Sequence, residues 1–264
     1  MKIGFIGCGN MATAMLKGIL KSGDVKNADM IASAKSDKTR EKIEKELGIQ
    51  KADTNAQVVD FADVVFLAVK PQFLEEVLDE IKDNVKEGQI FISIAPGKTL
   101  QWLGEHLGEG TKIIRTMPNT PAMVGEGMTA LCVNDLVTEE ETALAVKLCN
   151  TFGKSEVIPE HLMDAVVGVS GSSPAYVFMF LEAMADAAVA DGMPRAQAYK
   201  FAAQAVLGSA KLMLETGKHP GELKDMVCSP AGTTIEAVRV LEKFGLRSAV
   251  IEAEKVCADM SRNM

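Results

Sequence analysis

The sequence predicts an α/β protein with a doubly wound, mostly parallel sheet in its N-terminal half and helices alone in its C-terminal half. Up to about residue 158, short apolar runs alternate with helical patterns, as expected for consecutive βαβ units. From about Glu160 onward there is no convincing strand pattern, and long Ala- and Met-rich helical patterns follow. This change of pattern predicts two domains, 1–158 and 159–264.

The spacing of apolar residues predicts the elements of the first domain. The DVVFLAV run at 63–69 is continuous, which is typical of a strand buried on both faces. Residues 10–21 instead have helical spacing, with their apolar side chains on one face. The expected strands are 2–6, 29–32, 63–69, 89–95 and 112–117, with a short piece at 156–158. The expected helices are 10–21, 38–47, 73–85 and 138–151.

The second domain is expected to consist of helices 174–190, 194–215, 234–243 and 247–260. The helix from Tyr176 to Ala190 is apolar on most faces, although Glu182 and Asp186 interrupt it. A helix of this kind must be buried nearly everywhere, and a bundle of this size has few places for it. We therefore expect an oligomer with helices packed between subunits. The alternative is a tight monomeric core.

Composition and charge exclude several kinds of partner. The 264 residues carry a net charge of −8, which repels phosphate backbones and anionic lipid, so neither nucleic acid nor a membrane is expected as a partner. The five cysteines are widely spaced, with no CxxC pair and no His at metal-ligand spacing. We expect no metal site, and reduced thiols in a cytoplasmic protein. The N-terminus enters an apolar strand and a glycine turn directly, unlike a signal peptide.

A glycine-rich loop, GCGNMA at 7–12, follows the first expected strand and opens the first expected helix. It fits G-x-G-x-x-A, the phosphate-binding fingerprint of dinucleotide folds. Gly7 permits the tight turn, Gly9 lets the backbone approach a pyrophosphate, and Ala12 lets helix and strand pack closely. The helix N-terminus offers free N–H groups to the phosphates. The alternative is a purely structural turn, but the order strand, loop, helix favours a dinucleotide-binding Rossmann domain at 1–158.

The residues after the second strand bear on which dinucleotide binds. NAD-selective folds usually carry an acid at this strand end, which binds the ribose 2′-hydroxyl. Here the segment reads ASAKS at 32–36, and the first acid is Asp37. Two hydroxyls and Lys35 suit a 2′-phosphate better, so the sequence favours NADPH, with NADH as the alternative cofactor. The alternative interpretation is that Lys35 and Lys38 belong to a solvated loop.

Three further loops follow expected strands at their carboxyl ends, where ligands bind in a doubly wound sheet. They contain Lys70, the Ala-Pro-Gly turn at 95–97, and the segment RTMPNTP at 115–121, which we interpret as both a connector and a wall of the cofactor site. In the helical half, Thr233 and Glu236 match a capping box. A Gly-Thr-Thr helix start is a suitable cradle for a carboxylate, although an ordinary capped helix is the alternative interpretation.

These segments together resemble the pyrroline-5-carboxylate reductases nearly from end to end. The resemblance rests on GFIGCGNM at 4–11, LAVKPQ at 67–72, SIAPG at 93–97 and RTMPNTPAMVGEG at 115–127. Most specific are DAVVGVSGSSPAY at 164–176 and LKDMVCSPAGTTIEAVRVLE at 223–242. Ser173 and Ala231 stand where the family usually has Gly, and Pro96 where it usually has Ala. The Ala231 change bears on backbone freedom in the substrate loop.

The resemblance implies NAD(P)H-dependent reduction of L-1-pyrroline-5-carboxylate to L-proline. It implies a helical substrate-binding and oligomerisation domain at 159–264, which forms a dimer and often rings such as decamers. It implies that Thr234 hydrogen-bonds the ring nitrogen. The implied cofactor-binding residues are Gly7, Cys8, Gly9, Asn10, Met11, Ser33, Lys35, Asn55, Val69, Lys70 and Pro96. The implied substrate-binding residues are Val227, Ser229, Gly232, Thr233 and Thr234.

The implied chemistry agrees with what the sequence lacks. A cyclic imine can arrive already protonated, so hydride transfer to its carbon needs orientation more than a strong acid or base. None of His106, His161 and His219 is expected to be catalytic. One rival is a reductase of the 3-hydroxyacid dehydrogenase type, which needs an acid such as Lys in the helical domain, and no such Lys stands out in 164–176. A second rival is a non-catalytic NADP(H) sensor.

Overall fold

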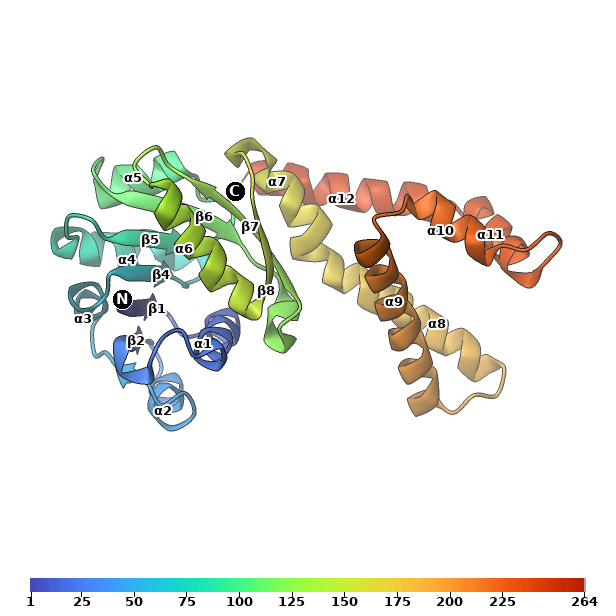
Figure 1. The fold of residues 1–264 in the computed structure, drawn as a ribbon, viewed down its shortest axis with the longest axis horizontal. Coiled ribbons are helices and arrows are strands. Elements are labelled where there is room, and N and C mark those ends of the chain that lie inside the picture. Colours follow the sequence, from blue (N-terminus) through green and yellow to red (C-terminus); the bar gives the residue numbers. More distant parts are fainter. Residues whose placement is uncertain (264) are drawn as a thin grey trace. The chain divides into compact units, whose positions relative to one another are not determined.

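A computed structural model describes residues 1–263 of the chain, and these form two compact units (Figure 1). The first unit comprises residues 1–172 together with the C-terminal segment from Val256. The second comprises Ser173–Lys255. Ser261 Oγ in the last helix donates a hydrogen bond of 2.7 Å to Asp164 Oδ1, which fixes the C-terminal segment to the first unit. The domain boundary near residue 158 stays a prediction, because compactness does not show which segments carry which function.

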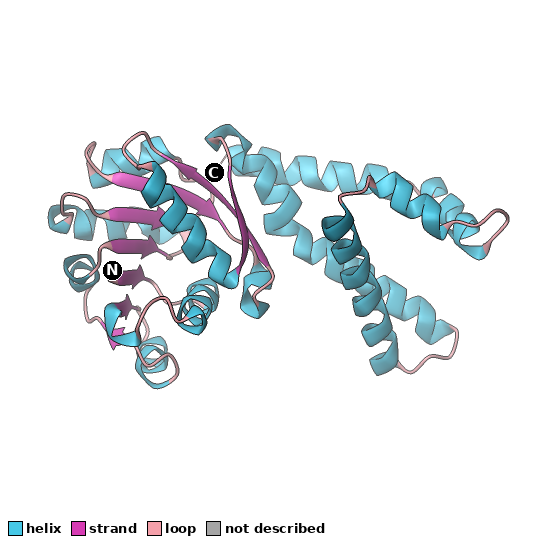
Figure 2. Ribbon diagram, in the orientation of Figure 1, coloured by secondary structure: helices cyan, strands magenta, loops and turns pink. Residues whose placement is uncertain are grey.

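One sheet, drawn in magenta in Figure 2, organises the first unit. It has eight strands in the order β3-β2-β1-β4-β5-β6-β7-β8. The first six strands in that order are parallel, and β7 runs antiparallel to β6. The order 3-2-1-4-5-6 is that of the Rossmann fold, so the predicted doubly wound, mostly parallel sheet is confirmed. The strands are β1 Ile3–Ile6, β2 Met30–Ser33, β3 Gln50–Lys51, β4 Val64–Leu67, β5 Ile90–Ser93, β6 Lys112–Met117, β7 Gly127–Val133 and β8 Gly153–Val157.

Helices cover both faces of this sheet and bury its central strands completely. Every residue of β1, β2, β4 and β5 is buried, which explains their continuous apolar runs. Phe5 of β1 and Phe66 of β4 stack on one face with ring centroids 4.4 Å apart. The helices are α1 Asn10–Ser22, α2 Asp37–Lys45, α3 Asn55–Phe61, α4 Leu74–Ile81, α5 Leu100–Leu107, α6 Glu139–Cys149 and α7 Met163–Val166. Sequence patterns missed α3, α5, α7, β3 and β7.

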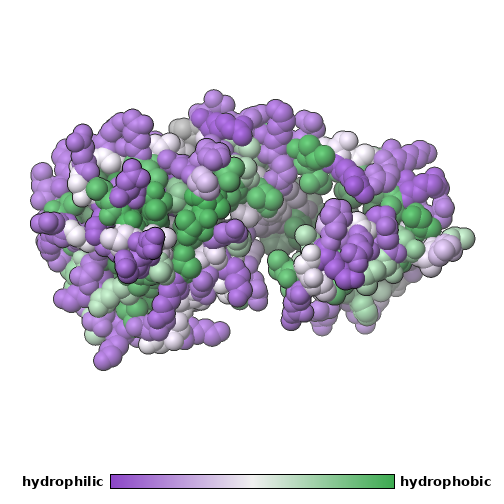
Figure 3. Space-filling view, turned by 45° about the horizontal axis from the view of Figure 1, so that its top comes forward, coloured by the Kyte–Doolittle hydropathy of each residue, from purple (hydrophilic) through white to green (hydrophobic). Residues whose placement is uncertain are grey.

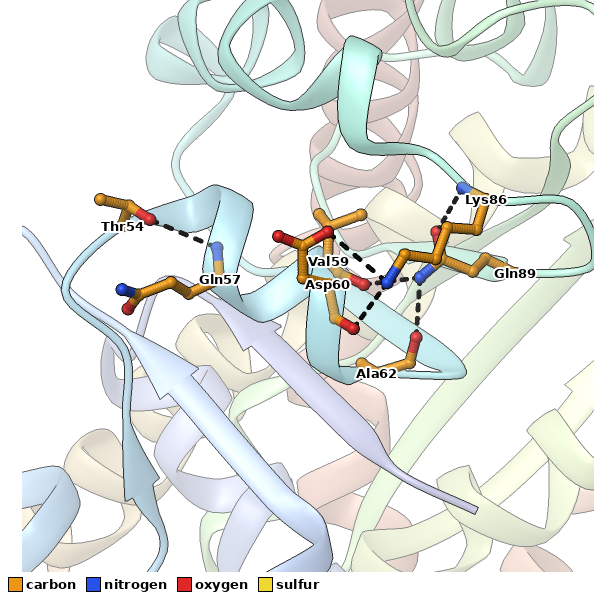
Figure 4. Close-up of polar contacts among 7 residues, drawn as sticks. All are labelled: Thr54, Gln57, Val59, Asp60, Ala62, Lys86 and Gln89. Carbon is orange, nitrogen blue, oxygen red and sulfur yellow. Dashed lines mark hydrogen bonds and ion pairs between the residues drawn. The ribbon is translucent and has the colours of Figure 1, made fainter.

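A buried glutamine satisfies the carbonyl groups at the end of α3 (Figure 4). Gln89 Nε2 donates to the carbonyl oxygens of Val59 and Ala62, each at 2.7 Å, and Gln89 Oε1 accepts from the backbone N–H of Lys86. Lys86 Nζ also donates to the carbonyl oxygen of Asp60. Helices leave their last carbonyls without intrahelical partners, so these bonds replace water at the end of α3. They also join α3 to the segment that enters β5.

We expect Gln89→Met to destabilise the protein, because methionine has nearly the same shape and cannot donate or accept these bonds. The carbonyls of Val59 and Ala62 and the N–H of Lys86 would lose their partner in a site where Gln89 itself is 6% exposed. Leaving buried polar groups unpaired costs about 1–3 kcal/mol. The thermal unfolding midpoint should fall by several degrees (roughly 2–4 °C per kcal/mol at this size). An unchanged midpoint would contradict the capping role.

A substitution at Thr129 in β7 is expected to increase the stability of the protein. Its side chain is 1% exposed, and its hydroxyl has no hydrogen-bond partner among the described residues. A buried unsatisfied hydroxyl is destabilising, so Thr129→Val should raise the unfolding free energy by about 1 kcal/mol. Thermal unfolding of the two proteins side by side measures this. A lower midpoint for the valine variant would show that the hydroxyl is satisfied.

The second unit consists of helices alone, as predicted. They are α8 Ser173–Ala190, α9 Arg195–Thr216, α10 Pro220–Val227, α11 Thr233–Lys243 and most of α12 Leu246–Arg262. In this single chain only Ala185 of α8 is buried, and Phe178 and Met179 are 65% and 69% exposed. Hydrophobic side chains accordingly reach the surface among charged ones in Figure 3. The predicted burial of α8 is therefore not provided by the chain's own helices.

By length and composition only, one helix of the described residues, Glu160–Ala190, is apolar enough to cross a membrane. Its α8 part also lines a groove against α9 of about 390 Å³, which includes Phe178, Met179 and Tyr199. Glu182 lies in the same groove, and Asp186 of α8 pairs with Arg195 at the start of α9. Carboxylates on an otherwise apolar helix are more typical of a protein interface than of a lipid-facing surface.

Candidate active site

The glycine-rich loop has the backbone geometry that its sequence predicts. Gly7 has φ +93°, and a Cβ at this position would lie 2.6 Å from the carbonyl oxygen of Ala68 and 2.9 Å from Val69 Cγ1. The Gly7 N–H donates to the carbonyl oxygen of Ser33 at 3.2 Å. The loop after β1 therefore touches the ends of β2 and β4, and no other residue type fits at position 7.

Gly9 differs from Gly7, because nothing within the protein itself requires a glycine there. It has an ordinary φ of −74°, and a Cβ there would have open space with no protein atom within 4 Å. Gly9 is also the N-cap of α1, which begins without a side-chain cap and without an acidic residue in its first turn. Open space in front of free N–H groups fits the pyrophosphate of a dinucleotide.

The carboxyl ends of four neighbouring strands meet at this edge of the sheet. Gly7 follows β1, Ser33 ends β2, Val69 and Lys70 follow β4, and Pro96 follows β5. Ser33 is buried, Val69 and Pro96 are half-buried, and Lys70 is exposed. Lys70 forms no ion pair among the described residues, so its ammonium is available to a cofactor phosphate. The fold thus brings together the side chains that the sequence assigned to cofactor binding.

Asn55 lies next to Ser33 and is held in place from a third element. Ser33 Oγ donates a hydrogen bond of 2.6 Å to Asn55 Oδ1. Asn55 Nδ2 donates to Glu80 Oε2 at 2.7 Å, and the Asn55 backbone N–H donates to Glu80 Oε1 at 3.2 Å. Glu80, in α4, was not singled out by the sequence, because nothing local marks a contact between residues 25 positions apart.

The segment after β2 carries two cations, Lys35 and Arg40, and the Arg40 guanidinium lies 3.8 Å from Asp37 Oδ1. The Lys35 ammonium is exposed and lies 5.3 Å from the centroid of the Phe73 ring. Arg40 Nε donates to the carbonyl oxygen of Ala34 at 2.7 Å, which holds the guanidinium against the same loop. Ser36 caps α2 by accepting from the N–H of Thr39. The sequence singled out Lys35 but missed Arg40, although a cation in the first turn of the helix after β2 was the available signal.

None of the five cysteines forms a disulfide bond. Burial raises the pKa of the Cys8 thiol, and it raises the pKa of Cys132 and of Cys149 to about 12. A raised pKa keeps these thiols protonated at neutral pH and therefore unreactive. Cys8, in the glycine loop, accordingly serves as a small buried residue, with Sγ 3.9 Å from Thr13 Oγ1.

The segment after β6 is tied to a π-helical turn, Val167–Ser172. Asn119 Nδ2 donates to the carbonyl oxygen of Ser170 at 3.0 Å, and Asn119 Oδ1 accepts from the N–H of Met128 at 2.8 Å. A Cβ on Gly171 would lie 2.8 Å from Met117 Cε, so the turn packs directly on the strand end. π-helical turns are frequent at functional sites. The sequence identified this segment as a connector but gave Asn119 no role.

In the second unit, the predicted capping box at Thr233 and Glu236 is wrong. The N-cap of α11 is Gly232, and no side chain caps it. The Gly232 N–H closes a turn onto the carbonyl oxygen of Ser229, which shifts the helix start by one residue, and Glu236 pairs with Arg239 instead. The first N–H groups of α11 therefore lack a side-chain cap, which favours the carboxylate cradle over the alternative interpretation of an ordinary capped helix.

The turn before α11 contains Ala231 at φ +56°, the one non-glycine residue with positive φ among the described residues. This left-handed conformation costs an alanine about 1 kcal/mol, and glycine adopts it freely. The loop therefore keeps the conformation that glycine would favour. Strain of this kind persists at ligand-binding loops when the surroundings fix the backbone.

Comparisons with known proteins agree with both units. Residues 160–264 match the family model of pyrroline-5-carboxylate reductase dimerisation, and residues 2–97 match the model described as NADP oxidoreductase, coenzyme F420-dependent. The chain is 55% identical to the pyrroline-5-carboxylate reductase of Escherichia coli, over 100% of this chain and 98% of that protein. The chain belongs to the pyrroline-5-carboxylate reductase family.

Solved structures of pyrroline-5-carboxylate reductases have the same fold. The enzyme from Coxiella burnetii has a TM-score of 0.92 at 33% identity, covering 99% of this chain and 97% of that one. The Plasmodium falciparum enzyme, with NADP bound, has a TM-score of 0.90 at 29% identity and covers 100% and 97%. As a member of this family the chain carries a dimerisation domain, which supports its self-association.

The residues predicted for the reductase site fall into two groups. Those around Gly7, Ser33, Asn55 and Val69 lie together in the first unit, joined by the contacts above. Those from Val227 to Thr234 form one loop and helix start in the second unit. The role of each residue toward cofactor or substrate stays a prediction.

Proposed function

We propose that this chain reduces L-1-pyrroline-5-carboxylate to L-proline, with NADPH as the preferred hydride donor and NADH as the alternative. The observation that carries the proposal is the full-length similarity to reductases of this name. The open space at Gly9, the uncapped start of α1 and the exposed Lys70 support a bound dinucleotide. Lys35 and Arg40 provide the charge for a 2′-phosphate.

The reaction adds a hydride from the nicotinamide to the C=N carbon, and the ring nitrogen keeps its proton as the C=N double bond becomes single. The protein's part is to orient the imine. We assign the substrate carboxylate to the free N–H groups at the start of α11, with Ser229, Gly232 and Thr233 around it and Val227 nearby. Thr234, half-buried in the first turn, would hydrogen-bond the ring nitrogen. Positioning of this kind contributes most of the rate when the imine arrives protonated.

The test is a direct assay. Purified protein, NADPH and pyrroline-5-carboxylate are mixed, the absorbance of the reduced cofactor is followed, and proline is measured by chromatography. We expect one proline formed for each NADPH consumed, and a slower reaction with NADH. No oxidation of NADPH would reject the enzyme assignment, even if the cofactor binds.

The exposed apolar face of α8 and its groove against α9 support a further part of this proposal. The chain works as a dimer, or as a ring of dimers such as a decamer, in which a second copy covers Phe178 and Met179. The absence of disulfide bonds among the five cysteines and the net negative charge suit a cytoplasmic enzyme without nucleic acid or membrane partners. Light scattering should give an even multiple of the 28.2 kDa chain mass, and a monomer would contradict the proposal.

A further inference from the structure

The hydrogen bonds between Glu80, Asn55 and Ser33 have a defined direction. An ionised carboxylate only accepts hydrogen bonds. Glu80 accepts from the Asn55 backbone N–H and from Asn55 Nδ2, so the side-chain amide of Asn55 must turn its oxygen toward Ser33. Ser33 Oγ, 2.6 Å from that oxygen, must then be the donor. Glu80 therefore determines where the Ser33 proton points, through one amide.

A Ser33 hydroxyl with its proton committed to Asn55 can only accept from a ligand. Ser33 ends β2, where dinucleotide folds bind the 2′ position of the adenosine ribose. A 2′-hydroxyl, as in NADH, can donate to Ser33. A 2′-phosphate offers acceptor oxygens there and gains nothing from a hydroxyl without a free proton, contrary to the expectation from the sequence that the Ser33 hydroxyl suits a 2′-phosphate. Its donors must be cations such as Lys35 and Arg40.

We propose that Glu80 is a positioning residue for cofactor selection. It fixes the direction of the Ser33 hydroxyl, which donates to Asn55, and so limits the preference for NADPH over NADH. It acts through Asn55 and touches no cofactor itself. The inference rests on the proposed cofactor site and adds to it a residue that sets the cofactor range.

Glu80→Gln tests this, because glutamine has the same shape and reverses the direction of the bonds. Its oxygen still accepts from the Asn55 backbone N–H, which cannot turn. Its NH₂ then faces the Asn55 side chain, which must flip and present Nδ2 to Ser33. The Ser33 proton becomes free for a 2′-phosphate. We expect the ratio of the NAD⁺ to the NADP⁺ dissociation constant to rise about tenfold, the size of one hydrogen bond to a charged group.

Glu76→Gln is the matched control, since it removes the same charge from the same helix, one turn earlier. Glu76 is exposed and forms no hydrogen bond or ion pair among the described residues. The ratio should stay near the wild-type value in this variant, and the effect of Glu80→Gln should persist at 0.5 M salt, where charge effects between exposed groups are screened. An unchanged ratio in Glu80→Gln, or an equal rise in Glu76→Gln, would overturn the inference.

Calorimetric titration with NADP⁺ and NAD⁺ measures these constants without turnover. The result is therefore distinguishable from a failure of the reductase assignment, which the proline assay reports. If the protein binds both dinucleotides but makes no proline, the proposed reaction is rejected. The ratio of the NAD⁺ to the NADP⁺ dissociation constant then still decides the role of Glu80.

Discussion

Replacing Gly9 with alanine should lower the affinity for NADPH on the order of 100-fold while costing the protein about 1 kcal/mol of stability or less, the effect of alanine at an N-cap. Position 9 has an ordinary φ of −74° and open space around a new Cβ, so the folded chain accepts the methyl group. The same methyl group would occupy the space in front of the α1 N-terminus that the pyrophosphate needs. Calorimetric titration with NADPH and a thermal unfolding curve measure the two effects.

Gly7→Ala is the matched control, because here the protein itself rejects the methyl group. At φ +93° the new Cβ would meet the carbonyl oxygen of Ala68 at 2.6 Å, a backbone atom that cannot turn away. We expect a loss of about 2 kcal/mol or more in unfolding free energy, together with weaker NADPH binding. Equal losses of stability in the two variants would contradict the distinction between a structural and a ligand-facing glycine.

The sequence predicted the elements whose signal is local. Val64–Leu67 and Ile90–Ser93 are buried on both faces, so their apolar runs are continuous and identify the strands to within two residues. The missed elements have weak local signals. Gln50–Lys51 is a two-residue exposed strand defined only by its pairing with β2, and α3 has seven residues with two buried. β7 is defined by its pairing with β6 and β8, and the periodicity of apolar residues in the sequence does not show such pairing.

The same reasoning separates the parts of the site that could be predicted from those that could not. The glycine loop could be predicted because its signal is local. Gly7 and Gly9 lie between β1 and α1, which directly precede and follow them in the sequence. Glu80 and Asn119 act through contacts made by the fold across many residues of chain, so no spacing reveals them. The capping box failed for another reason. Thr233 and Glu236 have the right spacing, but the turn at Ser229 starts the helix one residue earlier than the pattern requires.

Thr234→Ala should lower kcat by about 100-fold or more, the range of contributions from a group that hydrogen-bonds or protonates the reacting atom. The alanine variant keeps the backbone N–H groups at the start of α11, which we assign to the substrate carboxylate. The substrate KM should therefore change much less than kcat. Because we assign the Thr234 hydroxyl to the ring nitrogen of the substrate and not to the dinucleotide, the dissociation constant of NADPH should stay at its wild-type value.

Two further variants separate the hydroxyl of Thr234 from its shape. Thr234→Ser keeps the hydroxyl and should retain most of the activity, whereas Thr234→Val keeps the shape and should be as slow as alanine. Thr233→Ala, at the neighbouring position, should instead raise KM more than it lowers kcat, since Thr233 is assigned to the carboxylate. A valine variant with wild-type kcat would show that the ring nitrogen does not depend on this hydroxyl. An equal loss of NADPH binding in Thr234→Ala would place the residue in cofactor binding rather than at the imine.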